Sequence, residues 1–321
     1  MSRSKDTASP ETAAEVAVEE PAEAPTEASV DTSTEELAET CQEVLTTHPI
    51  GHFYSPVVNP SELDPEAIWP LSPRPVLGID FNDASHQRIL TEAFPRFISE
   101  YAYPEQLEET AELCDFYTQN SQFSWLDSRT LFVLLRQYRP KRMIEVGSGF
   151  STLLAADVKR RFLDDQMQLS CIEPYPRPFL RQKALGIDRL IEEKVQGVPY
   201  DVFEELQSGD ILFIDSSHVA KTGSDVNFLF FEVLPRLSRG VIVHIHDIFL
   251  PMDYLYEWVV NENRSWNEQY LLRALLMYSS AFRVVFGCSY AFHKFPHLVR
   301  KALAHEKGHA FGGGSFWIER V

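Results

Sequence analysis

The sequence predicts an α/β protein organised around a doubly wound, Rossmann-like parallel sheet. From residue 141 onward, short apolar runs alternate with stretches of helical periodicity, which is typical of parallel strands covered by helices on both faces. The first apolar run leads through a glycine turn into a helix, and two later runs end in acidic and histidine side chains. Because ligands bind at the carboxyl ends of strands in such sheets, these endings indicate where the functional site lies.

The N-terminal segment, residues 1–45, is predicted to be a disordered acidic tail. Its first 40 residues contain eleven acidic residues against Arg3 and Lys5, a net charge of −9 and half of the chain's formal −18. They nearly lack large apolar residues, so burial cannot offset the entropy lost on ordering. The rest of the chain is also acidic. This argues against a nucleic-acid partner, because nucleic-acid binding needs Lys and Arg against phosphates.

The sequence favours a cytoplasmic protein with no membrane span. Cys41, Cys114, Cys171 and Cys288 are widely spaced and form no C-x-x-C pair, so we expect neither a disulfide framework nor a zinc module. No apolar run reaches the roughly 20 residues that cross a bilayer. The N-terminus also has no apolar signal-peptide core.

Two ordered regions are expected to follow the tail. Residues 46–140 are predicted to form an N-terminal arm and helical cap, with helices at 84–102, 105–119 and 127–139. A separate short helix is expected at 37–48, where the tail ends. Residues 141–321 are predicted to form the ligand-binding domain, with strands at 142–146, 169–173, 191–196, 210–215, 240–246, 282–288 and 314–319. Its helices are expected at 151–163, 177–185, 200–207, 224–235 and 266–278. We expect residues 312–314, three glycines, to act as a flexible hinge before the last strand.

The turn Gly147-Ser148-Gly149 follows the first strand. A dinucleotide site has a third glycine three residues later, but this position is Thr152, so a pyrophosphate ligand is disfavoured. An E-x-G-x-G turn is instead used by sheets that bind S-adenosylmethionine, where the acid, here Glu145, helps to position the ligand's charged amino-acid end. The alternative is a glycine turn with a purely structural role.

Two further residues complete the predicted donor site. Glu173 ends the second apolar run about 25 residues after the turn, where a nucleotide-binding sheet places a carboxylate on the ribose hydroxyls. Gln196 is expected to end the third strand and to approach the adenine. For each residue, the alternative is an ordinary surface position at a strand end.

Acidic and histidine side chains follow the fourth and fifth strands. Asp215 and His218 follow one, and His246 and Asp247 end the other, so we expect them to converge above one crevice. Carboxylates suit Mg²⁺ and imidazole also admits Mn²⁺, Fe²⁺ or Zn²⁺, so Asp215, His246 and Asp247 are candidate metal ligands. Alternatively, His218 accepts a substrate proton as general base, and both roles can operate together. His244 shares the face of His246 but points deeper into the sheet, so we interpret it as structural.

The segments Asp215-Ser-Ser-His218, Gly223-Ser-Asp-Val-Asn227 and His244-Ile-His-Asp-Ile-Phe-Leu-Pro251 resemble class I S-adenosylmethionine-dependent methyltransferases, in particular bacterial methyltransferase domain family 24. The resemblance covers roughly residues 50–321. It implies a seven-strand methyltransferase sheet whose last strand is antiparallel. In related metal-dependent sugar O-methyltransferases, acids at the positions of Asp215 and Asp247 bind magnesium, and a histidine at the position of His218 is the proposed base. This chain departs from catechol-type enzymes, which carry Asp-Asn where it has His246-Asp247.

We therefore expect a methyltransferase that uses S-adenosylmethionine, with or without Mg²⁺ or another divalent metal, to O-methylate a hydroxylated small molecule or glycan. Glu268 and Gln269, at the start of the helix at 266–278, could read substrate hydroxyls. The alternatives are a metal-independent N-methyltransferase, a non-catalytic donor-binding or scaffold protein, and a metal-dependent hydroxylase on the same fold. Whether the chain forms a homo-oligomer is left open.

Overall fold

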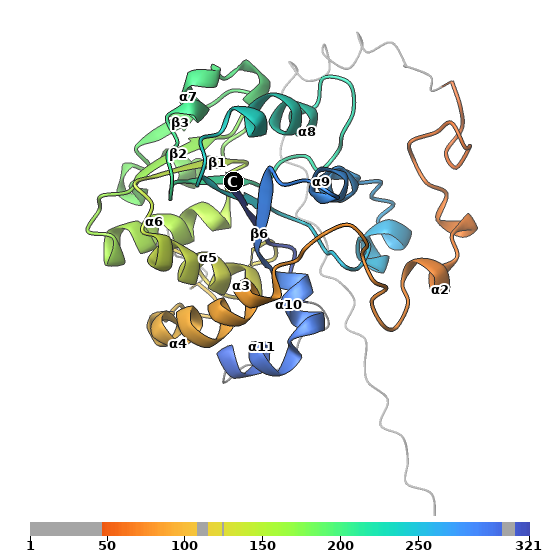
Figure 1. Cartoon of the computed structure of the whole chain (residues 1–321). Coiled ribbons are helices and arrows are strands. Elements are labelled where there is room, and N and C mark those ends of the chain that lie inside the picture. Colours follow the sequence, from red (N-terminus) through yellow and green to blue (C-terminus); the bar gives the residue numbers. More distant parts are fainter. Residues whose placement is uncertain (1–46, 108–114, 124, 304–311) are drawn as a thin grey trace, which may run out of the picture. The chain divides into compact units, whose positions relative to one another are not determined.

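The centre of the fold is a seven-stranded sheet in the order β3-β2-β1-β4-β5-β7-β6 (Figure 1). Its strands are β1 Arg142–Val146, β2 Gln168–Ile172, β3 Arg189–Ile191, β4 Ile211–Ile214, β5 Ile242–Ile245, β6 Phe282–Gly287 and β7 Phe316–Arg320. The strands from β1 to β5 are parallel, whereas β7 runs antiparallel to β5 and to β6. This arrangement confirms both the doubly wound sheet and the antiparallel last strand that the resemblance implied.

The computed structural model describes residues 47–107, 115–123, 125–303 and 312–321. Residues 50–321 form one compact unit. The predicted acidic tail, residues 1–45, lies outside the described residues, as does nearly all of the predicted helix at 37–48. Within the described part, no helix has the length and apolar character needed to cross a membrane.

Helices cover both faces of the sheet, because alternate strand residues point to opposite sides. Met143 and Phe213 face one apolar layer, which contains α4 Phe94–Phe97, α5 Trp125–Tyr138, α6 Phe150–Phe162, α10 Cys288–Lys294 and α11 Pro296–Ala302. Ile144 and Leu212 face the other layer, built by α7 Tyr200–Glu204, α8 Asp225–Phe228, η7 Leu229–Val233 and α9 Glu268–Leu276. All four residues of β4 are buried, as expected for a strand covered on both sides.

The parallel strands end in register, and this aligns the residues that follow them. Val146 of β1 pairs with Ile172 of β2 and Ile214 of β4, and Ile214 pairs with Ile245 of β5. Backbone bonds continue the ladder one residue further, from the N–H groups of Gly147, Glu173, Asp215 and His246 to neighbouring strands, at 2.8–3.0 Å. These four residues, one after each of four strands, therefore form a row along the carboxyl edge of the sheet.

Several predicted helices are confirmed and others are wrong. Residues 83–100 form one continuous helical run, consisting of α3 Asp83–Arg88, η2 Ile89–Ala93, α4 and η3 Ile98–Glu100. The predicted helix at 177–185 is instead two short 3₁₀ turns, Pro178–Arg181 and Lys183–Leu185, because prolines at 174, 176 and 178 disfavour a continuous helix. The described parts of 105–119 are not helical, and Thr118 and Gln119 donate back to the carbonyls of Pro104 and Glu105.

The connections after β5 contain more helix than the sequence pattern suggested. α10 begins directly after β6, and α11 follows it, where the sequence predicted no element. A π-helical turn at Glu257–Asn261 precedes α9. The remaining short elements are η1 Pro60–Glu62, α2 Pro65–Ile68, η6 Val195–Gly197 and η8 Leu234–Arg236.

The glycines at 312–314 do not form a flexible exposed hinge. All three are buried, and side chains would clash with their surroundings. A Cβ on Gly313 would lie 2.6 Å from the Asp127 carboxylate, and one on Gly314 would lie 2.9 Å from the Cα of Asp247. The glycines therefore allow the chain before β7 to pack closely against the end of β5.

Candidate functional site

The glycine turn after β1 has one glycine that packs against protein and one that leaves space. Gly147 has φ of 80°, and a Cβ there would lie 1.8 Å from the backbone oxygen of Asp215. Only glycine tolerates both the left-handed backbone and this contact. A Cβ on Gly149 would meet no heavy atom within 4 Å. The turn therefore fixes the end of β1 against the end of β4 and leaves Gly149 open for a ligand.

Glu173 lies against this turn, as the sequence predicted. Its Oε2 accepts from the backbone N–H of Ser148 at 3.2 Å, and its Oε1 accepts from that of Tyr175 at 2.9 Å. The side chain is half-buried and connects the end of β2 to the middle of the glycine turn. Its proposed contact with ribose hydroxyls remains a prediction.

Glu145 is fully buried and directed at the first turn of α6. Its two carboxylate oxygens accept from the hydroxyls of Ser151 and Thr152, both at 2.5 Å. Burial raises the pKa of Glu145 to about 7, although these two hydrogen bonds oppose the rise. The observed contacts give the acid a role in joining β1 to α6, and its predicted role at the donor's amino-acid end remains untested.

Gln196 does not end a strand. β3 ends at Ile191, and Gln196 lies five residues later, exposed in the 3₁₀ turn η6. Its side-chain amide donates to the carbonyl of Gly223 at 2.8 Å. The prediction placed the strand too late because Glu192, Glu193 and Lys194 interrupt the apolar run before Val195.

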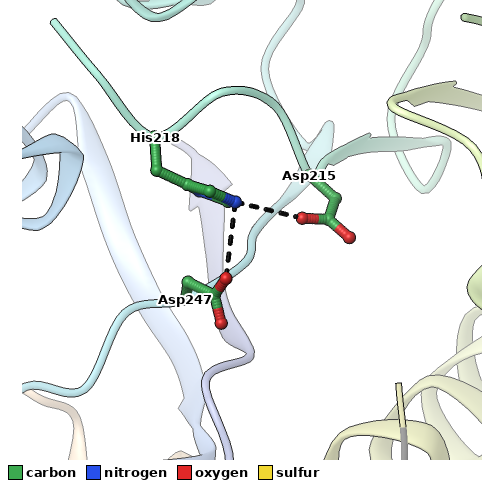
Figure 2. A group of neighbouring side chains, drawn as sticks. All are labelled: Asp215, His218 and Asp247. Carbon is green, nitrogen blue, oxygen red and sulfur yellow. Dashed lines mark ion pairs between the residues drawn. The ribbon is translucent and has the colours of Figure 1, made fainter. Parts of the chain in front are cut away.

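Asp215, His218 and Asp247 converge, as Figure 2 shows. The Nε2 of His218 lies 3.4 Å from Asp215 Oδ1 and 3.4 Å from Asp247 Oδ2. One ligand atom from each residue lies within 4.8 Å of the others. Asp215 follows β4, Asp247 follows β5, and His218 lies on the connection from β4 to α8, so the carboxyl edge of the sheet brings the three together.

Glu268 is a fourth member of this group, and sequence reasoning missed its role. Its Oε2 lies 3.0 Å from His218 Nδ1, and the glutamate is fully buried at the start of α9. The sequence predicts that Glu268 contacts substrate, because it lies at a helix start near the sheet edge. That position gives no sign of a histidine partner. We refer to Asp215, His218, Asp247 and Glu268 as the acid–histidine cluster.

Burial and charge shift the pKa values of the cluster in different directions. Burial acts to lower the pKa of His218, but Asp215, Glu268 and Asp247 outweigh it and hold that pKa well above its usual value. Burial raises the pKa of Asp247 and of Glu268, and the nearby histidines only partly oppose this effect. Three closely spaced carboxyls thus surround one imidazole, an arrangement that favours positive charge at its centre.

The two histidines of β5 and its end differ in role. His244 is fully buried, stacks on Phe213 at 3.7 Å between ring centroids, and lies 3.0 Å from the Ser315 hydroxyl through Nε2. Burial holds the pKa of His244 well below its usual value, which agrees with its predicted structural role. The Nε2 of His246 lies 3.6 Å from Asp247 Oδ1, on the opposite oxygen from His218.

Asp127 holds the segment that packs against Asp247, and sequence reasoning missed this role as well. It lies in the first turn of α5, and its carboxylate accepts from the backbone N–H groups of Gly314 at 3.1 Å and Ser315 at 2.7 Å. Asp127 therefore fixes the chain that packs against Asp247. Three consecutive glycines before a buried strand were the available signal of such close packing.

The donor atoms of the cluster fit a divalent cation. Two carboxylates and one imidazole nitrogen, mostly buried and close together, are ligand types that Mn²⁺, Fe²⁺ and Zn²⁺ accept in common. The glycine turn likewise fits S-adenosylmethionine, because it combines open space at Gly149 with a neighbouring carboxylate and has no third glycine for a pyrophosphate.

Comparison with known proteins agrees with this geometry. Residues 144–248 match the model of a family described as Methyltransferase domain. The matched segment runs from β1 to just past Asp247 and contains every residue predicted for donor binding, metal binding or catalysis, whereas Glu268 lies beyond it. Together with the strand order, the match supports an S-adenosylmethionine-dependent methyltransferase.

A relative with close sequence similarity is an uncharacterized protein from Archaeoglobus fulgidus. The two chains are 37% identical over 175 residues, which cover 53% of this chain and 78% of the relative. The chain belongs to the same family as this archaeal protein.

Two solved methyltransferases are more distantly similar. The S-adenosylhomocysteine-bound methyltransferase PaMTH1 of Podospora anserina shares 16% identity, with 76% of this chain and 98% of that chain covered and a TM-score of 0.39. The 16S rRNA (adenine(1408)-N(1))-methyltransferase of Catenulisporales acidiphilia shares 10% identity, with coverage of 68% and 97% and a TM-score of 0.28. Both likenesses are too distant to assign an activity.

Proposed function

We propose that this chain transfers the methyl group of S-adenosylmethionine to a hydroxyl oxygen of a small-molecule or glycan acceptor. The observation that carries the proposal is the common register of the strand ends, in which the glycine turn after β1 lies between Glu173 after β2 and the acid–histidine cluster after β4 and β5. A donor at the turn and an acceptor at the cluster would therefore meet at one edge of the sheet. Methyl transfer needs little more than such alignment of the oxygen with the methyl carbon.

The residues of the chain have distinct tasks in this proposal. The Gly147–Gly149 turn admits the donor closely, and Glu173 accepts hydrogen bonds from its ribose. Asp215 and Asp247 hold the acceptor side, where a bound divalent cation would lower the pKa of the acceptor hydroxyl. His218 lies between these two acids, where it can contact either the cation or the acceptor's proton.

The orientation of the two acids favours O-methylation over the metal-independent N-methyltransferase alternative. Capping of helices by Asp215 and Asp247 would have supported that alternative, whereas both side chains face His218 (Figure 2). A scaffold protein would have no need of one fully buried and two partly buried carboxyls around one imidazole, because such burial costs free energy. The cytoplasmic location and the acceptor class remain proposals.

Calorimetric titration of S-adenosylmethionine tests the donor half of the proposal. We expect one binding site in the wild type and at least tenfold weaker binding in Glu173→Gln, because two charge-assisted hydrogen bonds are weakened. Glu232→Gln is the matched control, since Glu232 is a half-exposed carboxylate paired with Arg236 away from the carboxyl edge. Equal affinities in all three proteins would remove Glu173 from the donor site, and no binding at all would contradict the proposed function.

Nuclear magnetic resonance of the products tests the acceptor half. The wild type would be incubated with ¹³C-methyl S-adenosylmethionine and matched panels of polyhydroxy and amine acceptors. We expect methyl ether signals from the hydroxylated panel. Methylamine signals alone would overturn O-methylation and support the N-methyltransferase alternative.

A further inference from the structure

The imidazole of His218 lies where the two metal-binding acids meet. Its Nε2 is equally distant, at 3.4 Å, from Asp215 Oδ1 and Asp247 Oδ2. A lone pair on Nε2 and two carboxylate oxygens at this separation repel one another unless positive charge, from a proton or from a metal cation, lies between them. The three atoms therefore face a common point that suits a cation.

Glu268 determines which ring nitrogen faces that point. Its Oε2 lies 3.0 Å from Nδ1 of His218, and because a carboxylate accepts hydrogen bonds, the ring proton belongs on Nδ1. In the neutral ring, Nε2 then directs its lone pair at Asp215 and Asp247, where a metal cation would take the place of a proton on Nε2. A carboxylate behind a metal-binding histidine is the usual way in which proteins fix the tautomer and orientation of that ligand.

The backbone holds His218 in this orientation. Its φ is 60°, a left-handed conformation that non-glycine residues rarely adopt, and Asp247 has φ of 55°. The backbone N–H groups of Asn267 and Glu268 both donate to the carbonyl of His218, at 3.1 and 3.2 Å. The ring of Trp266 also packs on the imidazole, with 4.4 Å between centroids. Uncommon backbone geometry that the surroundings enforce is typical of functional positions.

From this geometry we infer that His218 is itself a metal ligand, so that Asp215, His218 Nε2 and Asp247 form a one-histidine, two-carboxylate site for a divalent cation. Glu268 is the positioning residue of that ligand. The mixed ligand set favours Mn²⁺ or a similar transition-metal ion over Mg²⁺, because imidazole is a poor ligand for Mg²⁺. This assignment replaces both the general-base role expected for His218 and the expectation that His246 is the histidine ligand.

His246 is the second histidine close to the two acids and can be compared with His218 as a metal ligand. Its Nε2 lies 3.6 Å from Asp247 Oδ1, the oxygen turned away from His218. Its Nδ1 has no hydrogen-bond partner among the described residues, so no contact there fixes its tautomer. His246 is therefore close enough to the acids to be a rival ligand, but it lacks a carboxylate behind it.

Pulsed electron paramagnetic resonance of bound Mn²⁺ tests the inference. The full chain would be freed of metal with EDTA and loaded with Mn²⁺, and electron spin-echo envelope modulation would be recorded for directly coordinated ¹⁴N. We expect ¹⁴N modulation in the wild type and in His246→Gln, and none in His218→Asn. Asparagine is chosen because it tolerates a left-handed backbone. If His218→Asn does not fold, the His246→Gln spectrum decides, because modulation that survives there assigns the nitrogen to His218.

Titration calorimetry gives a second readout. We expect Mn²⁺ to bind the wild type at least tenfold more tightly than Mg²⁺. Glu268→Gln should keep the ¹⁴N modulation but bind Mn²⁺ about tenfold more weakly, since loss of such partners typically costs 10- to 100-fold in affinity. Mn²⁺ bound without ¹⁴N modulation, or modulation lost only in His246→Gln, would overturn the inference.

The inference rests on the proposed function only for the role of the cation in methyl transfer. If the wild type shows ¹⁴N modulation but does not bind S-adenosylmethionine, the metal site stands and the proposed function fails. If S-adenosylmethionine binds and hydroxyls are methylated without ¹⁴N modulation, the proposed function stands and the inference fails.

Discussion

The glycine turn after β1 and the acid–histidine cluster lie one strand apart, yet they accommodate buried acids in different ways. In the turn, each acid is satisfied locally. Glu145 accepts from two hydroxyls of α6, and Glu173 accepts from two backbone N–H groups. Each hydrogen bond comes from a neutral donor close to its acceptor. The acids of the turn therefore need no added cation.

The cluster instead depends on a single imidazole. Asp215, Asp247 and Glu268 all approach His218, and the Oε1 of Glu268 has no hydrogen-bond partner in the described part of the chain. Three carboxyls around one ring leave excess negative charge in a mostly buried place, which is costly unless a cation joins them. Burial of an acid therefore does not indicate a cation site by itself. A cation site is indicated where the local partners of the buried acids are insufficient.

The largest effect should come from breaking the contact that joins the two regions. We expect Gly147→Ala to lower the free energy of unfolding by more than about 3 kcal/mol, because it combines a left-handed backbone with a clash against the backbone of Asp215. Gly209→Ala is the matched control, since Gly209 has φ of 88° but no heavy atom near the added Cβ. Its expected cost is about 1 kcal/mol. Equal losses in urea denaturation would show that the contact with Asp215 does not matter.

Removing one charge from the cluster should affect cation binding and spare the donor. We expect Asp247→Asn to weaken Mn²⁺ binding about 100-fold, since a charged ligand becomes neutral. Asparagine keeps the shape of the side chain and tolerates the left-handed backbone. The affinity for S-adenosylmethionine should change less than threefold. Calorimetry of both ligands measures the two effects, and Asp253→Asn, outside the cluster, serves as the control. A matching loss of both affinities would contradict the separation of the two regions.

The free energy of unfolding should depend on pH through Glu145, the buried acid beside the turn. Because burial raises the pKa of Glu145 to about 7 from an unfolded value near 4.5, the folded state holds its proton more tightly. This contribution to stability is fully present below pH 4.5 and is lost as the pH rises through 7. We therefore expect the wild type to lose about 2 kcal/mol more than Glu145→Gln between pH 5 and 7.5.

Urea denaturation at several pH values measures this difference. The same variant should bind S-adenosylmethionine nearly as the wild type does if Glu145 only joins β1 to α6. Binding weakened tenfold or more would return Glu145 to the donor site. Parallel pH profiles for the two proteins would show that the buried carboxyl is not perturbed.

The smallest effect is expected at the outer end of the donor side. Gln196 lies exposed in η6 and its amide already donates to Gly223. We expect Gln196→Ala to change the affinity for S-adenosylmethionine less than twofold. A larger loss in calorimetry would mean that the side chain turns from Gly223 to the donor.

The sequence predicted the features that follow from periodicity and position along a strand. Apolar runs of four or five residues located β1, β2, β4 and β5 to within about two residues, and the rule that ligands bind at carboxyl ends brought Asp215, His218 and Asp247 together. Glycines and acids at these ends were informative because a parallel register aligns them. The seven-strand sheet with an antiparallel last strand came from the resemblance and was confirmed by the structure.

What the sequence could not predict depends on contacts between distant segments. Glu268 lies 50 residues from His218, and Asp127 lies 187 residues from Gly314, so no local pattern indicates either pair. The glycines at 312–314 look flexible in the sequence, because their need for close packing arises only against Asp127 and Asp247. The strand at 191–196 was misplaced because a charged turn separates Val195 from β3.

The central claim is that the glycine turn and the acid–histidine cluster form one site, with donor and cation side by side. Nuclear magnetic resonance of ¹³C-methyl S-adenosylmethionine bound to the wild type tests it most directly, because paramagnetic Mn²⁺ broadens the signal of a nearby methyl group. We predict strong broadening with Mn²⁺, none with Mg²⁺, and none in Asp247→Asn at the same Mn²⁺ concentration. A bound methyl signal that Mn²⁺ leaves unchanged, although calorimetry shows both ligands bound, would contradict the account.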